Sequence, residues 1–452
     1  MKNKEAGLEE VMETLSIKKG FEDEIFKVLK NRTEDDLIEI DESVKRIIAR
    51  VRSEGDPALF DMTKEFDKVA LGSLRVSEGD IKEAMEVVED ELLESLRLAA
   101  ENIRTFHEKQ VEKSWQYEKE DQVLLGQIIT PLESVGIYVP GGKASYPSTV
   151  LMNAIPAKIA NVARIVMVTP PDRQGKINPY VLAAAKIAGV DEIYKIGGAQ
   201  AVAALGYGTE TIKKVNKIVG PGNIFVARAK KYLYGLVDID MIAGPSEICI
   251  IADDPEDVQL IAADLLSQAE HDEMAASMLI TTSKELTASL KVELIKQLDA
   301  LERKDIAQQA IKHHGLIIEV EDMESAFCVA NKIAPEHLEI MLEDPMAYIP
   351  QIKNAGAVFL GRYSPEPLGD YFAGPNHTLP TSGTAAFASP LGVYDFLKRS
   401  SLIYYTEDAL RKEKDDIIRI AEKEGLTAHA NSIKVRFMNN EIKKEVDNDE
   451  KS

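Results

Sequence analysis

Four short polar segments carry side chains that could bind a metal ion or move protons. In Ser267–Asp272 (SQAEHD), Gln268 and His271 are three positions apart near the end of an expected helix, so they share one face. An amide oxygen and an imidazole nitrogen on one face could hold a metal ion. The alternative is a helix C-terminus at which a histidine interacts favourably with the helix dipole.

The second segment, Ala334–Leu338 (APEHL), places a carboxylate beside an imidazole. Proline ends the preceding helix, and we expect Glu336 and His337 on the turn that follows it. A histidine can take a proton near neutral pH, and a neighbouring carboxylate can orient or activate a water molecule. An exposed loop with a chance Glu-His pair is the competing interpretation.

The remaining two segments lie further along the chain. Pro367–Pro380 carries Asp370 and His377 in what we expect to be irregular structure beside an α/β sheet, where binding residues are common. Glu424–Ala430 (EGLTAHA) carries His429 in a C-terminal appendage, where a single histidine is a surface residue in most proteins.

These segments could together form one mixed nitrogen and oxygen site. Gln268 and Asp370 would each supply an oxygen, and His271 and His429 would each supply a nitrogen. Such a ligand set suits zinc or a similar divalent ion, and the absence of a thiolate argues against a closed structural zinc site. Because the residues are far apart in the sequence, their spacing leaves their convergence open.

Three glycine-rich turns follow expected strands, at Pro140–Lys143, Gly197–Gln200 and Gly220–Asn223. Glycine lets the backbone approach a ligand, and the N-terminus of the next helix favours an anion such as pyrophosphate. None has the spacing G-x-G-x-x-G or that of a Walker A loop. Each turn alone is more often just a tight connection, whereas three together favour a ligand crevice at one sheet edge.

The elements that position these residues alternate between β-branched runs and helical runs, which indicates parallel sheets with right-handed crossovers. Helices are expected at Tyr180–Ala188, Ile224–Tyr234 and Pro255–Glu270, and a long one over Asp80–Phe106. The expected strands are Val135–Val139, Arg164–Thr169, Glu192–Ile196, Val215–Val219, Glu247–Ala252, Met278–Thr282, Leu316–Glu319, Ala357–Leu360 and Leu402–Tyr405.

Composition narrows the class of protein. The 452 residues are 45% hydrophobic and 29% charged, as in a folded globular protein, and contain only two cysteines. The net charge of −22 disfavours nucleic acid and anionic membrane surfaces as partners. No apolar run is long enough to span a bilayer, and the first residues do not read as a signal peptide, so we expect a cytoplasmic protein.

Longer motifs around these residues resemble those of the histidinol dehydrogenase family. The resemblance covers nearly the whole chain in collinear order and is weakest in the first hundred residues. The matching segments are GGKASYPSTVLMNAIPAK (141–158), GGAQAVAALGYGT (197–209), VGPGNIFVARAKKYLYGLVDIDMIAGPSE (219–247), DLLSQAEHD (264–272), APEHLEI (334–340), PLGDYFAGPNHTLPTSGTA (367–385) and EGLTAHANSI (424–433).

The resemblance implies a role for each candidate residue. Glu336 would activate water and His337 would shuttle protons. The zinc ligands and Glu336 would also contact substrate. The implied zinc ligands are Gln268, His271, Asp370 and His429; the further substrate contacts are Ser246, His377 and Glu424; and the NAD contacts are Tyr138, Gln200 and Asn223.

The resemblance also implies a reaction and an assembly. L-histidinol would be oxidised through bound L-histidinal to L-histidine with two NAD and water, the last step of histidine biosynthesis, with one zinc ion per subunit. The chain would form a homodimer in which the C-terminal tail brings Glu424 and His429 to the site of the partner subunit. Apart from this second copy, a small-molecule substrate is the only partner we expect.

The expected fold is α/β, with two Rossmann-like αβα domains of parallel sheets, arranged as in aldehyde dehydrogenases, a helical N-terminal region and a helical C-terminal tail. The expected boundaries are 1–126 for the N-terminal region and 127–236 for the first αβα domain, on the NAD side. A second αβα domain would span 237–399, with the catalytic pair and most zinc ligands, and the tail 400–452.

Two other functions remain open. A zinc-dependent paralogue could oxidise another alcohol such as a sulfonate diol, and a metal-binding scaffold could lack activity, although the Glu336-His337 pair argues against the scaffold. Cys249 lies in an apolar strand, so we expect a core residue rather than a thiolate nucleophile. Arg228 and Ala386 depart from the family pattern at positions with no assigned role.

Overall fold

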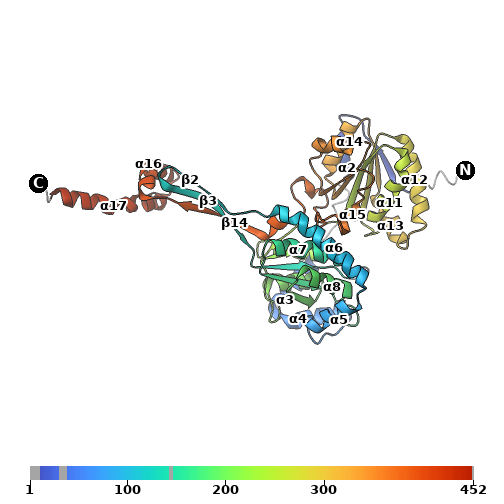
Figure 1. Ribbon diagram of the computed structural model, residues 1–452, viewed down its shortest axis with the longest axis horizontal. Helices are drawn as coiled ribbons and strands as arrows, with labels where there is room; N and C mark the ends of the chain where they lie inside the picture. The colour runs from blue at the N-terminus through green and yellow to red at the C-terminus, as the bar shows by residue number, and fades with distance from the viewer. Residues whose placement is uncertain (1–10, 30–37, 142–145, 450–452) are drawn as a thin grey trace. The chain divides into compact units, whose positions relative to one another are not determined.

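The computed structural model describes residues 11–29, 38–141 and 146–449. It divides into two compact units, one formed by Met1–Val111 with Pro131–Phe396 and the other by Glu112–Thr130 with Leu397–Ser452. The first unit contains two parallel β-sheets, each covered by helices on both faces (Figure 1). Gly142 and Lys143, from the first glycine-rich turn, lie outside the described residues.

The larger sheet has six parallel strands in the order β1-β11-β10-β9-β12-β13. Its central strand β9 has the sequence EICIIA and is buried over all but its first residue, as a strand covered on both faces requires. The strands are β1 (Glu13–Ser16), β9 (Glu247–Ala252), β10 (Ala276–Thr281), β11 (Leu316–Glu319), β12 (His337–Met341) and β13 (Ala357–Leu360).

Side chains of β9 alternate between the two faces of this sheet. Ile248 and Ile250 pack with α11 (Val258–Ala269), α12 (Lys284–Leu298) and α13 (Lys304–His314). Cys249 and Ile251 pack on the opposite face with α2 (Ile25–Leu29) and α14 (Met323–Ile333) (Figure 1). The cysteine is fully buried in this core, as the sequence predicts.

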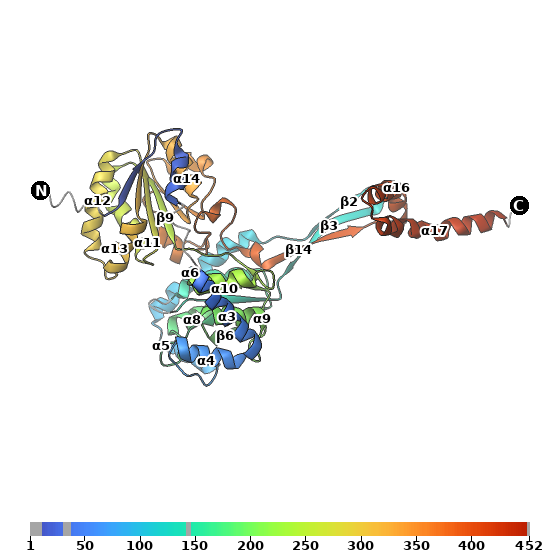
Figure 2. The ribbon, with the colours of Figure 1, turned by 180° about the vertical axis from the view of Figure 1, so that it is seen from behind.

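The second sheet has five parallel strands in the order β6-β5-β4-β7-β8. They are β4 (Ser134–Tyr138), β5 (Arg164–Thr169), β6 (Glu192–Lys195), β7 (Lys217–Val219) and β8 (Asp238–Ile239). One face is covered by α3 (Ile38–Glu54), α4 (Asp56–Phe66), α9 (Gly198–Tyr207) and α10 (Ile224–Leu233) (Figure 2). On the other side α7 (Pro147–Ile159) and α8 (Pro179–Ala188) pack with α5 (Glu78–Val87) and α6 (Asp90–His107) (Figure 1).

The second unit combines a small sheet with two helices. Its strands are β2 (Trp115–Lys119), β3 (Val123–Pro131) and β14 (Leu397–Tyr404), in the order β14-β3-β2, and β2 pairs antiparallel with β3. Helices α16 (Glu407–Lys423) and α17 (Thr427–Asp449) pack against each other. Thr406 caps α16 by accepting a hydrogen bond from the N–H of Ala409 at 3.2 Å.

The structure confirms the predicted fold class, with two parallel-sheet αβα arrangements, a helical N-terminal region and C-terminal helices. The domain boundaries remain a proposal. The N-terminal region contributes to both sheets, because β1 pairs with β11 whereas α3 and α4 pack on the five-stranded sheet. Arg228, one of the departures from the family pattern, forms an ion pair with Asp41 of α3.

Three local predictions were wrong. The helix expected over Asp80–Phe106 is interrupted between α5 and α6, because Val88 adopts an extended conformation. His337 does not lie on a turn but begins the buried strand β12, whereas Glu336 lies in the bend just before it. Asp370 is not in irregular structure but in the short helix α15 (Glu366–Tyr371), which has a proline in its first turn.

No helix among the described residues combines the length and the apolar character needed to cross a membrane.

Candidate metal and active site

Buried polar side chains from β12, α15 and the end of α11 meet at the amino-terminal ends of β9 and β12. These two strands are direct neighbours, with His337 opposite Ile248. α15 contributes Glu366 and Asp370, which are four positions apart and therefore share one helix face. Ser267 of α11 lies 3.2 Å from Glu366 (Oγ to Oε2), so the cluster links all three elements.

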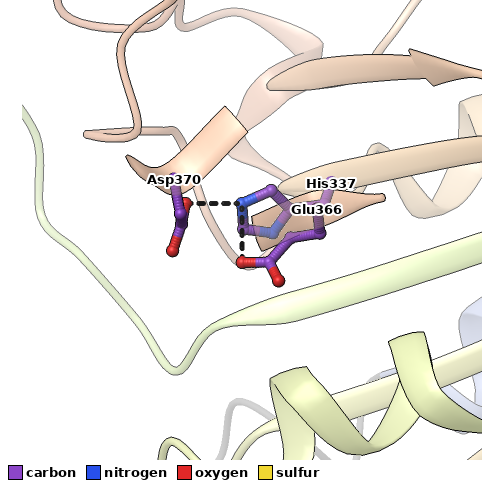
Figure 3. Close-up of side chains that lie close together, drawn as sticks. All are labelled: His337, Glu366 and Asp370. Atoms are coloured by element: carbon purple, nitrogen blue, oxygen red, sulfur yellow. Dashed lines mark ion pairs between the residues drawn. The ribbon is translucent and has the colours of Figure 1, made fainter. Parts of the chain in front are cut away.

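His337 is held in one tautomer. Its Nδ1 lies 2.9 Å from the carbonyl oxygen of Glu247, which can only accept, so Nδ1 carries the proton. The other ring nitrogen, Nε2, is buried without a hydrogen-bond partner. It lies 3.9 Å from Oδ1 of Asp370 and 4.0 Å from Oε1 of Glu366, as Figure 3 shows. A neutral His337 therefore presents a lone pair to the space between these groups.

Two further histidines are fixed in the same way. Nδ1 of His271 donates to the carbonyl oxygen of Ser267 at 2.9 Å, and Nδ1 of His377 donates to that of Asp370 at 3.0 Å. In their neutral forms both keep the lone pair on Nε2, the nitrogen available to a metal ion or a substrate proton. Backbone hydrogen bonds thus fix which ring nitrogen carries the proton in all three neutral imidazoles.

The carboxyl groups of the cluster are strongly desolvated. Glu336 is 6% exposed, and its Oε2 accepts a hydrogen bond from the N–H of Glu247 at 2.8 Å. Burial raises the pKa of Glu336 well above its usual range and also raises the pKa of Asp370. Burial lowers the pKa of His337, and it lowers that of His377 to about 4. Each shift favours the neutral form of its group.

Two further carboxyl groups, those of Glu339 and Asp264, lie beside this cluster. Glu339, two residues after His337 on β12, accepts a hydrogen bond from the N–H of Glu366 at 2.7 Å through Oε1. Burial raises the pKa of Glu339 well above its usual range, and the nearby carboxyl group of Asp264 on α11 raises it further. Burial raises the pKa of Asp264 to about 6 and that of Glu366 to about 7.

These groups fit a divalent cation. One ligand atom from each of His337, Glu366 and Asp370 lies within 4.8 Å of the others. Gln268 is 1% exposed, and its Oε1 has no hydrogen-bond partner. Among the described residues, only histidines form ion pairs with these carboxylates, so no Lys or Arg compensates them. A bound cation would favour their charged forms, and the donor set of imidazole, amide and carboxylate suits zinc.

The contacts between described residues therefore bring together only some of the predicted zinc ligands. Asp370 lies in the cluster, and His271 is hydrogen-bonded to the backbone of Ser267, whose hydroxyl group contacts Glu366 of the cluster. His429 and the predicted substrate contact Glu424 belong to the second unit, at the junction of α16 and α17, and both are exposed. Ser246 is half-buried and directly precedes Glu247, whose backbone is hydrogen-bonded to both Glu336 and His337, the predicted catalytic pair.

The predicted NAD contacts gather at the carboxyl ends of β4, β6 and β7. Tyr138 ends β4, and its hydroxyl oxygen accepts a hydrogen bond from the N–H of Gly198 at 3.0 Å. Burial raises the pKa of Tyr138 to about 12, so the hydroxyl keeps its proton. Gln200 is buried in the first turn of α9. This edge of a parallel sheet is where nucleotides usually bind.

The turn at Gly220–Asn223 requires glycine. Gly220 has φ +107°, and a Cβ there would lie 2.2 Å from the carbonyl oxygen of Tyr138. Asn223 caps α10, because its Oδ1 accepts hydrogen bonds from the N–H groups of Phe225 and Val226 at 3.1 and 3.2 Å. The amide NH2 of Asn223 remains on an exposed residue and can donate to a ligand.

Sequence reasoning missed Glu366. It stands in Pro365-Glu366-Pro367, where a single glutamate between prolines gives no signal of burial. Its spacing of four from Asp370 is the one feature that could have indicated a shared helix face.

Comparison with known proteins agrees with the motifs. The family model described as histidinol dehydrogenase matches residues 30–437. Histidinol dehydrogenase from Clostridium acetobutylicum is 56% identical over 412 residues, which cover 91% of this chain and 96% of that protein. The enzyme of the same name from Listeria innocua is 59% identical over 399 residues, 88% of this chain and 93% of that protein.

A solved structure is similar over the whole fold. The crystal structure of histidinol dehydrogenase from Elizabethkingia anophelis superposes with a TM-score of 0.87 at 38% identity, and the match covers 95% of this chain and 99% of that one. The family match, the related sequences and this structure all span most of the chain and point to a dehydrogenase. The chain belongs to the histidinol dehydrogenase family.

Proposed function

We propose that this chain oxidises L-histidinol to L-histidine in two successive hydride transfers to NAD, with L-histidinal held in the site between them. The observation that carries the proposal is the buried, unpartnered Nε2 of His337, fixed as a base next to Asp370 and beside Glu336. The assignment of L-histidinol as the substrate rests on the sequence similarity to the histidinol dehydrogenases named above.

The proposed metal is one zinc ion per subunit. Gln268, His271 and Asp370 would hold it together with His429 of the second unit, and the unpartnered Oε1 of Gln268 supports this assignment. When bound, zinc would hold the amino and imidazole nitrogens of the substrate and so orient its alcohol carbon. Ser246, His377 and Glu424 are the proposed further substrate contacts, and Tyr138, Gln200 and Asn223 the proposed NAD contacts.

In the first half-reaction, His337 accepts the hydroxyl proton while hydride leaves the alcohol carbon for NAD, which gives the aldehyde and the first NADH. Nε2 is the only ring nitrogen that can accept, since Nδ1 donates to Glu247. His337 then releases this proton to solvent, and in the second half-reaction Glu336 takes a proton from water as it adds to the aldehyde, which gives the anion of the hydrate. This anion loses a proton to His337 and hydride to the second NAD, which gives the carboxylate.

Glu336 can act as this base only in its charged form, although burial raises its pKa. A cation at the adjacent carboxylates would lower that pKa, so occupancy of the metal site and readiness of the base would be linked. Burial of the site also keeps bulk water and amines away from the aldehyde.

The chain is further proposed to act as a cytoplasmic homodimer in which Glu424 and His429 complete the site of the other subunit. Both residues are exposed in the second unit, which leaves them available to another copy. Sites shared across a two-fold interface occur in both subunits alike.

The test is the yield of NADH from limiting L-histidinol with excess NAD, with and without a zinc chelator. Two NADH per histidinol, lost on chelation and restored by zinc, are expected. One NADH per histidinol would mean that the aldehyde escapes and that the role of Glu336 is wrong. No NADH from the zinc-loaded protein would favour a paralogue that oxidises another alcohol, such as a sulfonate diol.

A further inference from the structure

Glu366 occupies a position that the proposed reaction leaves without a role. It is 1% exposed, in the first turn of α15, and Asp370 follows it on the same face. Its Oε1 has no hydrogen-bond partner and faces Nε2 of His337 at 4.0 Å, as Figure 3 shows. A buried carboxyl group with an unpartnered oxygen costs free energy, so packing alone does not explain this side chain.

Contacts on its other side tie Glu366 to the neighbouring elements. Its N–H donates to Oε1 of Glu339 on β12 at 2.7 Å. Its Oε2 lies 3.2 Å from Oγ of Ser267, whose carbonyl oxygen accepts from Nδ1 of His271. Ser267 also directly precedes Gln268. One side chain therefore connects α15 to the turn of α11 that carries two proposed zinc ligands.

Glu366 also lies beside the third proposed ligand. One oxygen of its carboxyl group is within 4.8 Å of a carboxylate oxygen of Asp370, which follows one turn later on the same helix. A hydrogen bond to one oxygen of a carboxylate fixes the plane of the group and thereby the direction of the other oxygen. Partners of this kind orient metal ligands, and their loss typically weakens metal binding 10–100-fold.

We propose that Glu366 is a positioning residue of the metal centre, which holds Asp370 and the Ser267–His271 turn in the geometry that binds the ion. This inference rests on the proposed function, in particular on zinc at Gln268, His271 and Asp370. Glu366 acts through its hydrogen bonds, which depend on the length of its side chain. Glutamine, which has the same length, should therefore replace it, whereas the shorter aspartate should not.

The experiment measures metal affinity in the full-length protein, by competition of Zn²⁺ with a chromophoric chelator. The visible absorption of the Co²⁺-loaded protein reports ligand geometry without any turnover. The variants are Glu366→Gln, Glu366→Asp and Glu366→Ala, with Glu256→Ala as an exposed glutamate control from the segment before α11. Thermal unfolding of each metal-free protein separates loss of the fold from loss of the site.

Glu366→Gln is expected to bind Zn²⁺ within about threefold of the wild type, because its amide can donate to Asp370 and accept from Ser267. Glu366→Ala and Glu366→Asp are expected to bind about 10–100-fold more weakly, with a changed Co²⁺ spectrum and a metal-free melting temperature near that of the wild type. If Glu366→Ala does not fold, Ser267→Ala removes the same contact from the other side and is expected to weaken binding about threefold or more.

Two results would overturn the proposal. One is a Glu366→Asp or Ser267→Ala protein that binds Zn²⁺ as tightly as the wild type. The other is a Glu366→Gln protein as weak as the shortened variants, which would show that the charge and not the hydrogen bond matters. Failure of the proposed function looks different, since the wild-type protein itself would then bind no Zn²⁺.

Discussion

Nδ1 of His337 donates a hydrogen bond to the backbone carbonyl of Glu247 at 2.9 Å, across the two neighbouring strands β12 and β9. A backbone carbonyl cannot move away without breaking the sheet, so the tautomer and ring orientation of this histidine are set by the fold itself. The proposed catalytic base is therefore oriented before any ligand binds.

Replacement of this base should abolish turnover without loss of structure. In His337→Asn the shorter amide cannot reach the substrate proton, and kcat is expected to fall about 10²–10⁴-fold, with NAD binding unchanged.

The wild-type rate should fall as the pH drops through the pKa of His337, because only the neutral ring accepts a proton. That pKa is lowered by burial, so the acid limb should lie below pH 6.5. Steady-state rates from pH 5 to 9 test this, with His313→Asn, exposed on α13, as the control; an acid limb that survives in His337→Asn would contradict the assignment.

Replacement of Glu336 should separate the two half-reactions. Glu336→Gln keeps an oxygen to accept from the N–H of Glu247 but cannot take a proton from water. Oxidation of supplied L-histidinal is expected to slow about 10²–10⁴-fold, whereas the first hydride transfer slows far less. Single-turnover NADH formation from each substrate measures both steps. Equal loss in the two steps would remove the assigned role in hydration.

Gly220, in the turn before α10, and Gly235, after this helix, form a matched pair of glycines. Gly220→Ala would place a Cβ 2.2 Å from a backbone oxygen at φ +107°, whereas Gly235→Ala has φ +97° and nothing within 4 Å. Both variants should lose about 1–2 kcal/mol to backbone strain, and Gly220→Ala should lose clearly more. Urea unfolding gives the stabilities and fluorescence titration the NAD affinity. Only Gly220→Ala should bind NAD more weakly; an equal effect at both sites would argue against the turn as a cofactor contact.

Asp67, after α4, should make stability depend on pH. Burial raises its pKa from 3.8 to about 6, so the folded protein holds this proton more tightly than the unfolded chain. The effect of Asp67 on the free energy of unfolding is therefore absent below pH 3.8. It becomes increasingly destabilising as the pH rises to about 6, and it stays destabilising above that pH. Asp67→Asn should gain at most about 1 kcal/mol at pH 8, because water screens this partly exposed group, and the gain should shrink towards pH 4.5. A gain independent of pH in urea unfolding, or an equal one in the exposed control Asp415→Asn, would contradict this origin.

The shared site of the proposed dimer can be tested by mixing two inactive proteins. If His429 acts in the other subunit, a heterodimer of His429→Ala and His337→Ala chains has one intact site and one doubly altered site. Random subunit exchange should then restore about a quarter of wild-type activity, because half the dimers are mixed and each has one working site of two. Activity that stays at the level of the separate proteins would place His429 in the site of its own subunit.

The sequence predicted the buried strands well. β5, β9 and β11 match their expected bounds, since β-branched residues that pack on both faces leave an apolar run, and the partly exposed edge strand β13 matches its bounds as well. β12 was missed because its sequence, HLEIM, alternates polar and apolar residues after a proline, yet all five are buried. Here the polar residues face a functional site inside the protein, which residue type alone cannot distinguish from a solvent-exposed face.

The candidate site was predicted in part for a similar reason. His337 and Asp370 were recognisable by chemistry and family motif, and the structure brings them together. Glu366, Glu339 and Asp264 were not, because a buried carboxyl group looks like a surface one until the packing of three distant elements is known. The sequence motifs identify the proposed metal ligands but not the buried carboxyl groups that lie beside them.

The pairing of β9 with β12 has a consequence for the folding of this enzyme. A shift of β12 by two residues would keep every apolar side chain on its proper face, so burial alone hardly opposes it. It would nevertheless move His337 about 6.6 Å along the strand, away from the peptide group that orients it and Glu336. Such a misregistered molecule would look folded by circular dichroism and yet be inactive. The fraction of sites that turn over in a single-turnover burst therefore measures how faithfully this register is chosen.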